Sequence, residues 1–250
     1  MAPMIVAPAF VPLLLLLASL PGLALGAAQV GGVYVKFAED YQSARLTEAI
    51  ITDFRVMCRR LKGQELQIRG DTALVGRATL EQYYSADGTR RSWIRRRHLN
   101  VSKDLCLVDV QPVVEKKLFD YTQNVAWRYT STHRKPWSRQ RLLSRADATV
   151  AASALADSDI PALPGDGRSV GKDKIAGVSC DIHKLLPNIT ACVWLAAKSG
   201  DIAHPRSLNL SYQIEHEDGR VDTSTAVSVN LKAAIDAELL FPPAEALTAK

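Results

Sequence analysis

Two cysteines that enclose a short stretch with turn character constrain the fold more than any other feature of this sequence. Cys180 and Cys192 begin and end the segment CDIHKLLPNITAC, in which Pro187–Asn188 interrupts two strand-like runs. A pair of antiparallel strands that turns about residue 186 places Cys180 opposite Cys192, within the distance that a disulfide bridges. Such a bridge closes a small loop and stabilises the hairpin by about 3 kcal/mol.

The four cysteines of the chain fit disulfides better than a metal site or a redox centre. No CxxC motif occurs, and the spacing of Cys180 and Cys192 matches no zinc-ligand pattern. Cys58 and Cys106 each lie in a run that alternates between apolar and polar residues, so we expect a second bridge between them. Four paired cysteines predict an oxidising compartment.

The segment before Lys36, the first charged side chain, predicts export. Leu13–Leu20 has the length of a signal-peptide core, Pro21 breaks it, and Ala24–Gly26 supplies the small residues that a signal peptidase reads. We therefore expect a signal peptide over residues 1–26 and a periplasmic or secreted mature protein without an integral membrane segment. A membrane anchor is the alternative, but prolines interrupt a stretch that should span about 20 residues.

Short alternating runs separated by turn residues predict a mainly antiparallel sheet in the rest of the chain. Residues 78–97 and 207–231 are expected to be hairpins that turn at Ala86–Gly88 and at Asp218–Gly219. Further strands are expected over residues 52–70, 104–119 and 122–132, because apolar residues recur there with period two.

Two segments carry apolar residues near helical spacing. Residues 37–50 are expected to form a short amphipathic helix, and Ser138 is expected to cap a second helix that continues to Ala156. The predicted fold class is therefore α+β: a curved, half-barrel-like antiparallel sheet with about two helices, stapled by disulfides.

A loop rich in Pro, Gly and Asp, residues 157–172, is the best candidate for an internal boundary. A loop that merely connects two elements explains the same composition, so we expect one exported α+β domain over residues 27–250. The apolar fraction of 47% is sufficient for a packed core.

Positive charge is concentrated in the middle of the sequence. Residues 90–145 hold 14 Lys or Arg against 4 Asp or Glu, whereas the whole chain carries a net charge of +5. A basic cluster with aromatic residues in it can bind anionic groups. The alternative is that strand alternation sends half of these arginines to a solvated face and that Trp127 belongs to the core. The candidate ligand-binding or anion-binding residues are Arg91, Trp93, Arg95, Arg97 and Trp127.

No catalytic motif of the GxSxG, HExxH or P-loop type occurs, and the five histidines are scattered along the chain. We therefore expect a binding protein rather than an enzyme, without a cofactor or a metal ion. An exported protein also seldom meets nucleic acid. The alternative is a hydrolase whose residues converge only in the folded chain, with His183 or His216 beside a carboxylate.

The C-terminal third resembles the periplasmic lipoprotein-carrier-like proteins in the order of its parts. The strand KIAGVSCDIHKL bends at a glycine, CVWLA is its partner, a long hairpin follows to Asn230, and LLFPPAE closes the region. Members of this family share a half-open antiparallel barrel that encloses helices, and they often bind acyl chains. The resemblance implies an acyl-binding inner surface.

These observations lead to two hypotheses about function. The first is an exported, non-enzymatic envelope protein that binds an apolar or amphipathic ligand, such as a lipid or a lipoprotein-like molecule, in a concave sheet. The second is a protein-interaction or regulatory module that binds an envelope protein partner through the basic segment 90–145.

Overall fold

The computed structural model describes residues 28–133, 136–142, 169–195 and 207–248. The expected signal peptide over residues 1–26 lies outside the described residues. The same is true of most of the expected helix 138–156 and of most of the candidate boundary 157–172.

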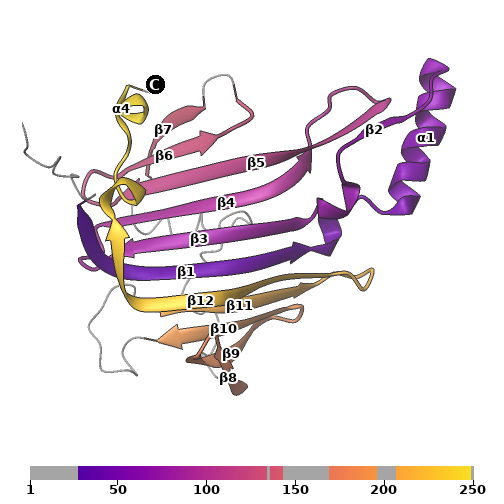
Figure 1. Ribbon diagram of the computed structural model, residues 1–250. Helices are drawn as coiled ribbons and strands as arrows, with labels where there is room; N and C mark the ends of the chain where they lie inside the picture. The colour runs from indigo at the N-terminus through magenta and orange to yellow at the C-terminus, as the bar shows by residue number, and fades with distance from the viewer. Residues whose placement is uncertain (1–27, 134–135, 143–168, 196–206, 249–250) are drawn as a thin grey trace, which may run out of the picture.

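One continuous sheet forms the body of the molecule (Figure 1). Its strands follow one another in the order β7-β6-β5-β4-β3-β1-β12-β11-β10-β9-β8, and all of these neighbours pair antiparallel, whereas β2 pairs in parallel with β5. The strands are β1 (Gln29–Tyr41), β2 (Gln67–Arg69), β3 (Arg77–Ser85), β4 (Arg90–Asn100), β5 (Leu107–Asp120), β6 (Val125–Thr130), β7 (Trp137–Arg141), β8 (Gly171–Ile175), β9 (Val178–Leu186), β10 (Ile189–Leu195), β11 (Ser207–Glu215) and β12 (Val221–Asp236).

The first and last long strands join the two halves of the chain. β1 lies between β3 and β12, so it pairs with the N-terminal meander β3–β7 on one side and with the C-terminal strands β12–β8 on the other. Most of the remaining neighbours are joined by short turns. In the β11–β12 turn Gly219 has φ of 79°, a left-handed conformation that glycine adopts without a Cβ clash.

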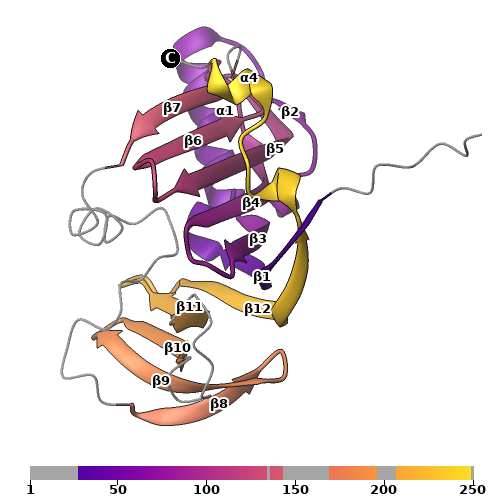
Figure 2. The same ribbon diagram turned by 90° about the vertical axis from the view of Figure 1, so that its left-hand side faces the viewer.

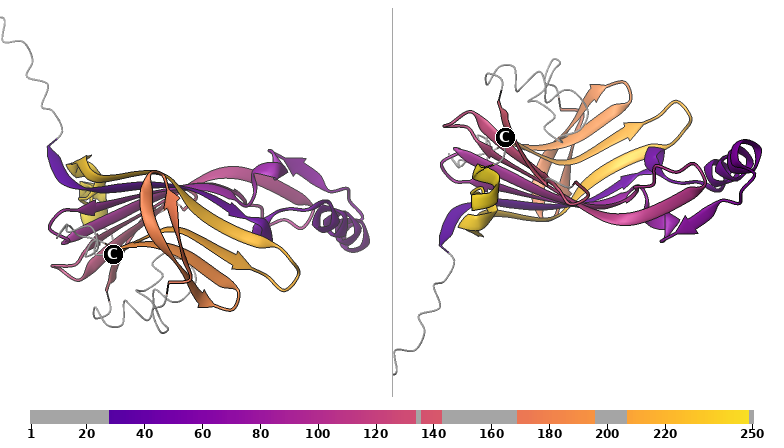
Figure 3. Two further views of the ribbon diagram at one scale, coloured as in Figure 1. Left: turned by 90° about the horizontal axis from the view of Figure 1, so that it is seen from below. Right: turned by 90° about the horizontal axis from the view of Figure 1, so that it is seen from above.

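The sheet is strongly curved and is not closed into a barrel (Figures 2 and 3). The pairing is irregular at four places, which is where a sheet bends: between Gly32 and Tyr34, Lys36 and Phe37, Ile189 and Thr190, and Cys192 and Val193. Gly32 is required at the first of these, because a Cβ there would collide with the carbonyl oxygen of Tyr84. The predicted class, a curved half-barrel-like antiparallel sheet with two helices and two disulfides, is confirmed.

The C-terminal segment covers one face of the N-terminal half of the sheet. After β12 the chain forms a 3₁₀ turn, η3 (Ala237–Leu239), and the short helix α4 (Ala244–Leu247). Ala246 of α4 packs with Leu118 and Trp127 on the outer side of the curve (Figure 2). We call this side the outer face and the opposite, concave side the inner face.

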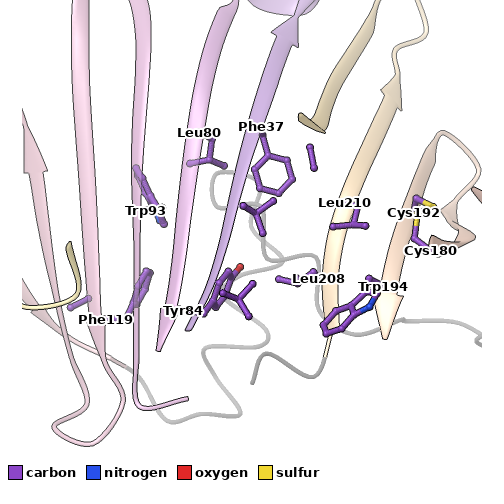
Figure 4. Close-up of a cluster of buried hydrophobic side chains, with 14 residues drawn as sticks. Phe37, Leu80, Tyr84, Trp93, Phe119, Cys180, Cys192, Trp194, Leu208 and Leu210 are labelled. Atoms are coloured by element: carbon purple, nitrogen blue, oxygen red, sulfur yellow. A yellow bond between two sulfur atoms is a disulfide. The ribbon is translucent and has the colours of Figure 1, made fainter. Parts of the chain in front are cut away.

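The main apolar cluster lies on the inner face (Figure 4). Phe119 of β5 belongs to it, whereas the preceding residue, Leu118, packs on the outer face, as the period-two geometry of a strand requires. Neither of the two α-helices of the described residues packs on this inner cluster. The labelled side chains of the cluster are Phe37, Leu80, Tyr84, Trp93, Phe119, Cys180, Cys192, Trp194, Leu208 and Leu210.

Helix α1 (Glu48–Lys62) corrects two predictions. Residues 37–50 were expected to be a helix, but Phe37 and Tyr41 continue the alternation of β1, and 3₁₀ turn η1 (Gln42–Ala44) ends that strand. Residues 52–70 were expected to be a strand, but most of them belong to α1 or to the turn that follows it, with only β2 at their end.

The ends of α1 explain why it forms. The side chain of Thr47 accepts a hydrogen bond from the Ile50 amide, and Gly63 ends the helix in the left-handed conformation. Ile51 and Cys58, two turns apart on one face, are the buried residues of the helix. This helical spacing decides the structure, because the period-two pattern of Phe54, Val56 and Cys58 has no neighbouring strand to satisfy it.

The second expected helix is wrong at its start. Ser138 lies in β7, opposite Arg128 of β6, and so does not cap a helix.

A further 3₁₀ turn, η2 (Thr72–Leu74), follows β2. Its N-cap is Asp71, whose side chain accepts a hydrogen bond from the Ala73 amide.

Both predicted disulfides are present, and the predicted register of one is wrong. Cys58 is bonded to Cys106 and Cys180 to Cys192, with Cα–Cα distances of 5.1 and 5.5 Å. However, Cys192 pairs with Ile182 rather than with Cys180. The two-residue turn is Pro187–Asn188, not residue 186, and the pairing slips between Ile189 and Thr190, so the bridge joins diagonal positions.

We predict that replacing Cys58 and Cys106 together by alanine lowers the free energy of unfolding by about 4 kcal/mol, because the bridge spans 48 residues of the unfolded chain. The same change at Cys180 and Cys192, which span 12 residues, should cost about 3 kcal/mol. Chemical denaturation measures both values.

Amide hydrogen exchange separates local from global effects. Loss of the Cys58–Cys106 bridge should accelerate exchange in α1 far more than in β1 or β12. Unchanged exchange in α1 would show that packing alone holds the helix in place.

Candidate functional site

Strand β4 carries four of the five predicted site residues on one face. Arg91, Trp93, Arg95 and Arg97 occupy alternate positions, and Trp93 belongs to the inner cluster. The structure therefore brings these four side chains to the inner face, and Arg91 and Arg95 are buried there rather than exposed at a rim.

Trp127 is not part of this set. It packs on the outer face with Leu118, Val125 and Ala246 of α4. Its place in the core agrees with the alternative that the sequence left open.

A buried ion pair is the centre of the inner face. Arg95 of β4 holds Glu39 of β1 through two contacts, Nε to Oε2 at 3.0 Å and Nη2 to Oε1 at 3.2 Å. The side chain of Glu39 is fully buried and that of Arg95 is 10% exposed. Charges so placed persist because each compensates the desolvation of the other.

Two tyrosines extend this pair across the sheet. The Tyr41 hydroxyl donates to Glu39 Oε1 at 3.0 Å and lies 3.0 Å from the hydroxyl of Tyr212 on β11. The network thus runs from β4 through β1 to β11 and connects the two halves of the sheet.

Burial sets the protonation states of the network. Burial raises the pKa of Tyr41, and the charge of Glu39 raises it further, so the hydroxyl stays a donor. Burial also raises the pKa of Tyr212. For Arg95 burial acts to lower the pKa, but Glu39 and the tyrosines outweigh it and the pKa is raised. Arg95 therefore remains cationic at every physiological pH.

A second carboxylate on the inner face serves two arginines. Glu115 of β5 is buried and receives a hydrogen bond from Arg97 Nη2 at 3.0 Å, while Arg128 of β6 lies 4.0 Å away. The side chains of Arg97 and Arg128 remain 32% and 57% exposed.

Cations also lie over the aromatic rings of this face. The Arg91 guanidinium lies 5.0 Å from the ring centre of Tyr84, and Lys117 Nζ lies 4.8 Å from that of Phe119. On β1 and β3–β6 the inner face therefore presents five cationic side chains against two carboxylates. The cations are Arg91, Arg95, Arg97, Lys117 and Arg128, and the carboxylates are Glu39 and Glu115.

The residues of this candidate site that sequence reasoning missed are Glu39, Tyr41, Glu115 and Tyr212. The sequence does contain a signal for Glu39. It occupies the next alternate position after the apolar residues Val33, Val35 and Phe37, so a charged side chain is expected on the same face as these three. Its assignment to a helix concealed that pattern. Tyr212 gave no comparable signal, since its partner Tyr41 is 171 residues away in the chain.

The structure does bring His216 beside a carboxylate, as the hydrolase alternative required, but the order of the groups is wrong for Ser43 to act as a nucleophile that His216 activates. His216 Nε2 lies 3.0 Å from Asp222 Oδ2, and Ser43 donates its amide (2.9 Å) and its hydroxyl to the same carboxylate. A nucleophilic serine needs the imidazole between itself and the acid. Here Asp222 lies in the middle, so these contacts fasten η1 to the β11–β12 hairpin.

His183 lies buried on β9, and among the residues that the structure describes neither of its ring nitrogens has a hydrogen-bond partner. Within the same residues no group of His, Cys, Asp and Glu side chains could hold a metal ion. No helix of the described part is both long and apolar enough to cross a membrane.

Comparison with known proteins gives few matches. No protein-family model matches the sequence, and no curated protein matches it. Seven chains of solved structures match, among them one from the crystal structure of MucB in complex with MucA(peri), at 14% identity and a TM-score of 0.31. The match covers 86% of this chain but only 55% of that chain. A likeness this weak carries no argument about function, and the resemblance to lipoprotein-carrier-like proteins stays a prediction.

We predict that Glu39→Gln destabilises the protein by about 3 to 5 kcal/mol, because it leaves the buried Arg95 without its counter-charge. Glu81→Gln is the matched control. Its partner Arg96 is half exposed, so the loss should stay below about 1 kcal/mol. Urea denaturation at neutral pH compares the two variants.

A double variant tests whether the unpaired charge causes the loss of stability in Glu39→Gln. Glu39→Gln with Arg95→Met removes both charges and should recover most of the lost stability. Equal destabilisation by the single and double variants would show that packing, not charge, accounts for the loss.

Asp222 should make stability depend on pH in the acid range. Burial acts to raise the pKa of Asp222, but hydrogen bonds from Ser43 and the proximity of His216 outweigh it and lower the pKa. The stabilisation is thus complete above the ordinary carboxyl pKa and is lost as the pH falls through the lowered value. Denaturation of Asp222→Asn below about pH 4 should show a shallower acid loss than the native chain. Parallel acid profiles would contradict this.

Proposed function

We propose that this chain is an exported, non-enzymatic binding protein that holds an amphipathic ligand with an anionic group against the inner face of its sheet. The observation that carries the proposal is the charge of the inner face on β1 and β3–β6, where five cationic side chains and two carboxylates lie beside a large apolar cluster. Positive charge in a site of low dielectric favours a complementary anion.

The residues of the main cluster are buried, so the apolar part of the ligand would lie along the partly buried side chains that pack against them, such as Ile182, Val229 and Leu231. Each methylene that leaves water contributes about 0.8 kcal/mol. An acyl chain therefore suits this surface, with its headgroup toward the partly exposed Arg97 and Arg128.

Two disulfides support the proposal of export to the periplasm or to the outside of the cell, because such bonds persist in oxidising compartments. The continuous sheet supports a single domain over residues 27–250, since β1 and β12 unite the two halves.

The network of Glu39, Arg95 and the tyrosines supports binding rather than catalysis, because its polar groups form ion pairs and hydrogen bonds with one another.

An interaction module that recruits an envelope protein through the basic segment is the second candidate. Strand β7 favours it, because this strand carries Arg139 and Arg141 exposed and pairs on one side only among the strands that the structure describes. The same charged edge also protects against non-specific pairing.

Binding of a fluorescent fatty acid and of the alcohol of the same chain length tests the proposal. The acid should bind more tightly than the alcohol. Lys117→Gln with Arg128→Gln should weaken binding of the acid about tenfold and leave the alcohol unaffected, because only the acid makes charge-assisted hydrogen bonds. Arg97 stays in these variants to keep Glu115 paired.

The matched control removes the same charge from the other face of β5 and of its other neighbour, β4. Lys116→Gln with Arg96→Gln should leave both affinities unchanged, because these residues alternate with the inner set. Equal binding of acid and alcohol, or equal effects of the two double variants, would overturn the proposal. Loss of a protein partner on charge reversal of Arg139 and Arg141, without acid binding in the native chain, would favour the interaction module.

A further inference from the structure

Helix α1 exposes an apolar stripe to solvent. Val56, Met57 and Leu61 are 58%, 38% and 65% exposed, and they lie in the last two turns of the helix. The buried residues Ile51 and Cys58 occupy the opposite side. Exposed apolar residues that gather on one helix mark a surface that meets another apolar phase.

Basic side chains are frequent in the same part of the helix. The part of α1 from Arg55 to Lys62 holds four cations and no carboxylate. Arg60 lies within the exposed stripe, and Lys62 is also exposed. Arg55 and Arg59 form exposed ion pairs with Glu48 and Glu65, at 3.1 and 2.9 Å.

The N-terminal half of the helix differs from this pattern. Asp53 is exposed and lies one turn before Met57 on the same side. An apolar and basic surface is therefore confined to residues 56–62.

The position of α1 makes this surface accessible. The helix lies beyond one end of the strands, at the opposite end of the molecule from α4 (Figures 1 and 3). The Cys58–Cys106 bridge fixes its buried side to the start of β5, which directs the stripe away from the sheet. The surface is convex and rigidly oriented.

We propose that residues 56–62 of α1 dock this protein on the surface of an anionic phospholipid bilayer. Val56, Met57 and Leu61 enter the boundary between headgroups and acyl chains, and the exposed Arg60, which lies among them on the helix surface, meets the lipid phosphates. A helix that lies in the interface combines an apolar stripe with cations near it. A partner protein with an apolar groove would match the three apolar side chains but gives no reason for the cation among them.

This inference is independent of the ligand proposed for the inner face, because the two surfaces share no residue. Together they would place the inner face at a membrane, where amphipathic molecules are available.

Co-sedimentation with vesicles tests the docking surface. The purified disulfide-bonded chain should bind vesicles of equimolar phosphatidylcholine and phosphatidylglycerol, and bind pure phosphatidylcholine more weakly. Replacing Val56, Met57 and Leu61 together by serine should lower partitioning at least about tenfold. Arg60→Gln should lower it about fivefold, and added salt should reproduce the loss.

All four side chains are exposed, so these variants should keep the native stability, which denaturation verifies. The matched control is Leu186→Ser with Val227→Ser, two residues of similar exposure elsewhere on the sheet, which should leave partitioning unchanged. The α1 variants should also keep their affinity for the fluorescent fatty acid, so this inference and the proposed ligand can fail separately.

Three outcomes would overturn the inference: absence of vesicle binding, equal binding to neutral and anionic vesicles, or equal losses in the α1 and control variants. Capture of a protein by the native helix that persists without any vesicle binding would also overturn it and would identify the surface as a protein interface.

Discussion

The pairing of β1 with β12 holds the two halves of the molecule together. It joins the first and the last strand of the described chain over twelve paired positions, with two irregularities in the register. Both strands are longer than any of β8–β11. On its other side β1 pairs with β3 of the N-terminal meander, and β12 pairs with β11. Without this pairing β3–β7 and β8–β11 would be two small sheets, each with an unpaired edge and half of an apolar cluster.

The buried network strengthens the same connection from the inner face. Glu39 lies on β1 itself, its cation comes from β4, and Tyr212 comes from β11. A buried ion pair adds little net stability, but the cost of separating its members is high, so it specifies which strands meet. The surplus of positive charge beside it on β1 and β3–β6 is the basis of the proposed preference for anionic ligands, and the disulfide at α1 fixes a second, separate surface.

Local sequence patterns determined the parts of the fold that depend on neighbours along the chain. The hairpin over residues 78–97 and the hairpin that turns at Asp218–Gly219 follow from alternation and turn residues. The pairing of all four cysteines also followed from sequence, as did the placement of Arg91, Trp93, Arg95 and Arg97 on one side of a strand. Period-two geometry fixes that side without any knowledge of what covers it.

Tertiary structure decided the rest. Residues 37–41 have helical spacing and strand alternation at once, and only the neighbours β3 and β12 select the strand. The register at Cys192 depends on where the turn slips, and the burial of Trp127 depends on α4 from the far end of the chain. The same holds for the site: cations were visible in the sequence, but Glu39 and Tyr212 are brought to them by pairing over long separations. Sequence specifies which faces a segment presents, whereas only packing decides which faces meet.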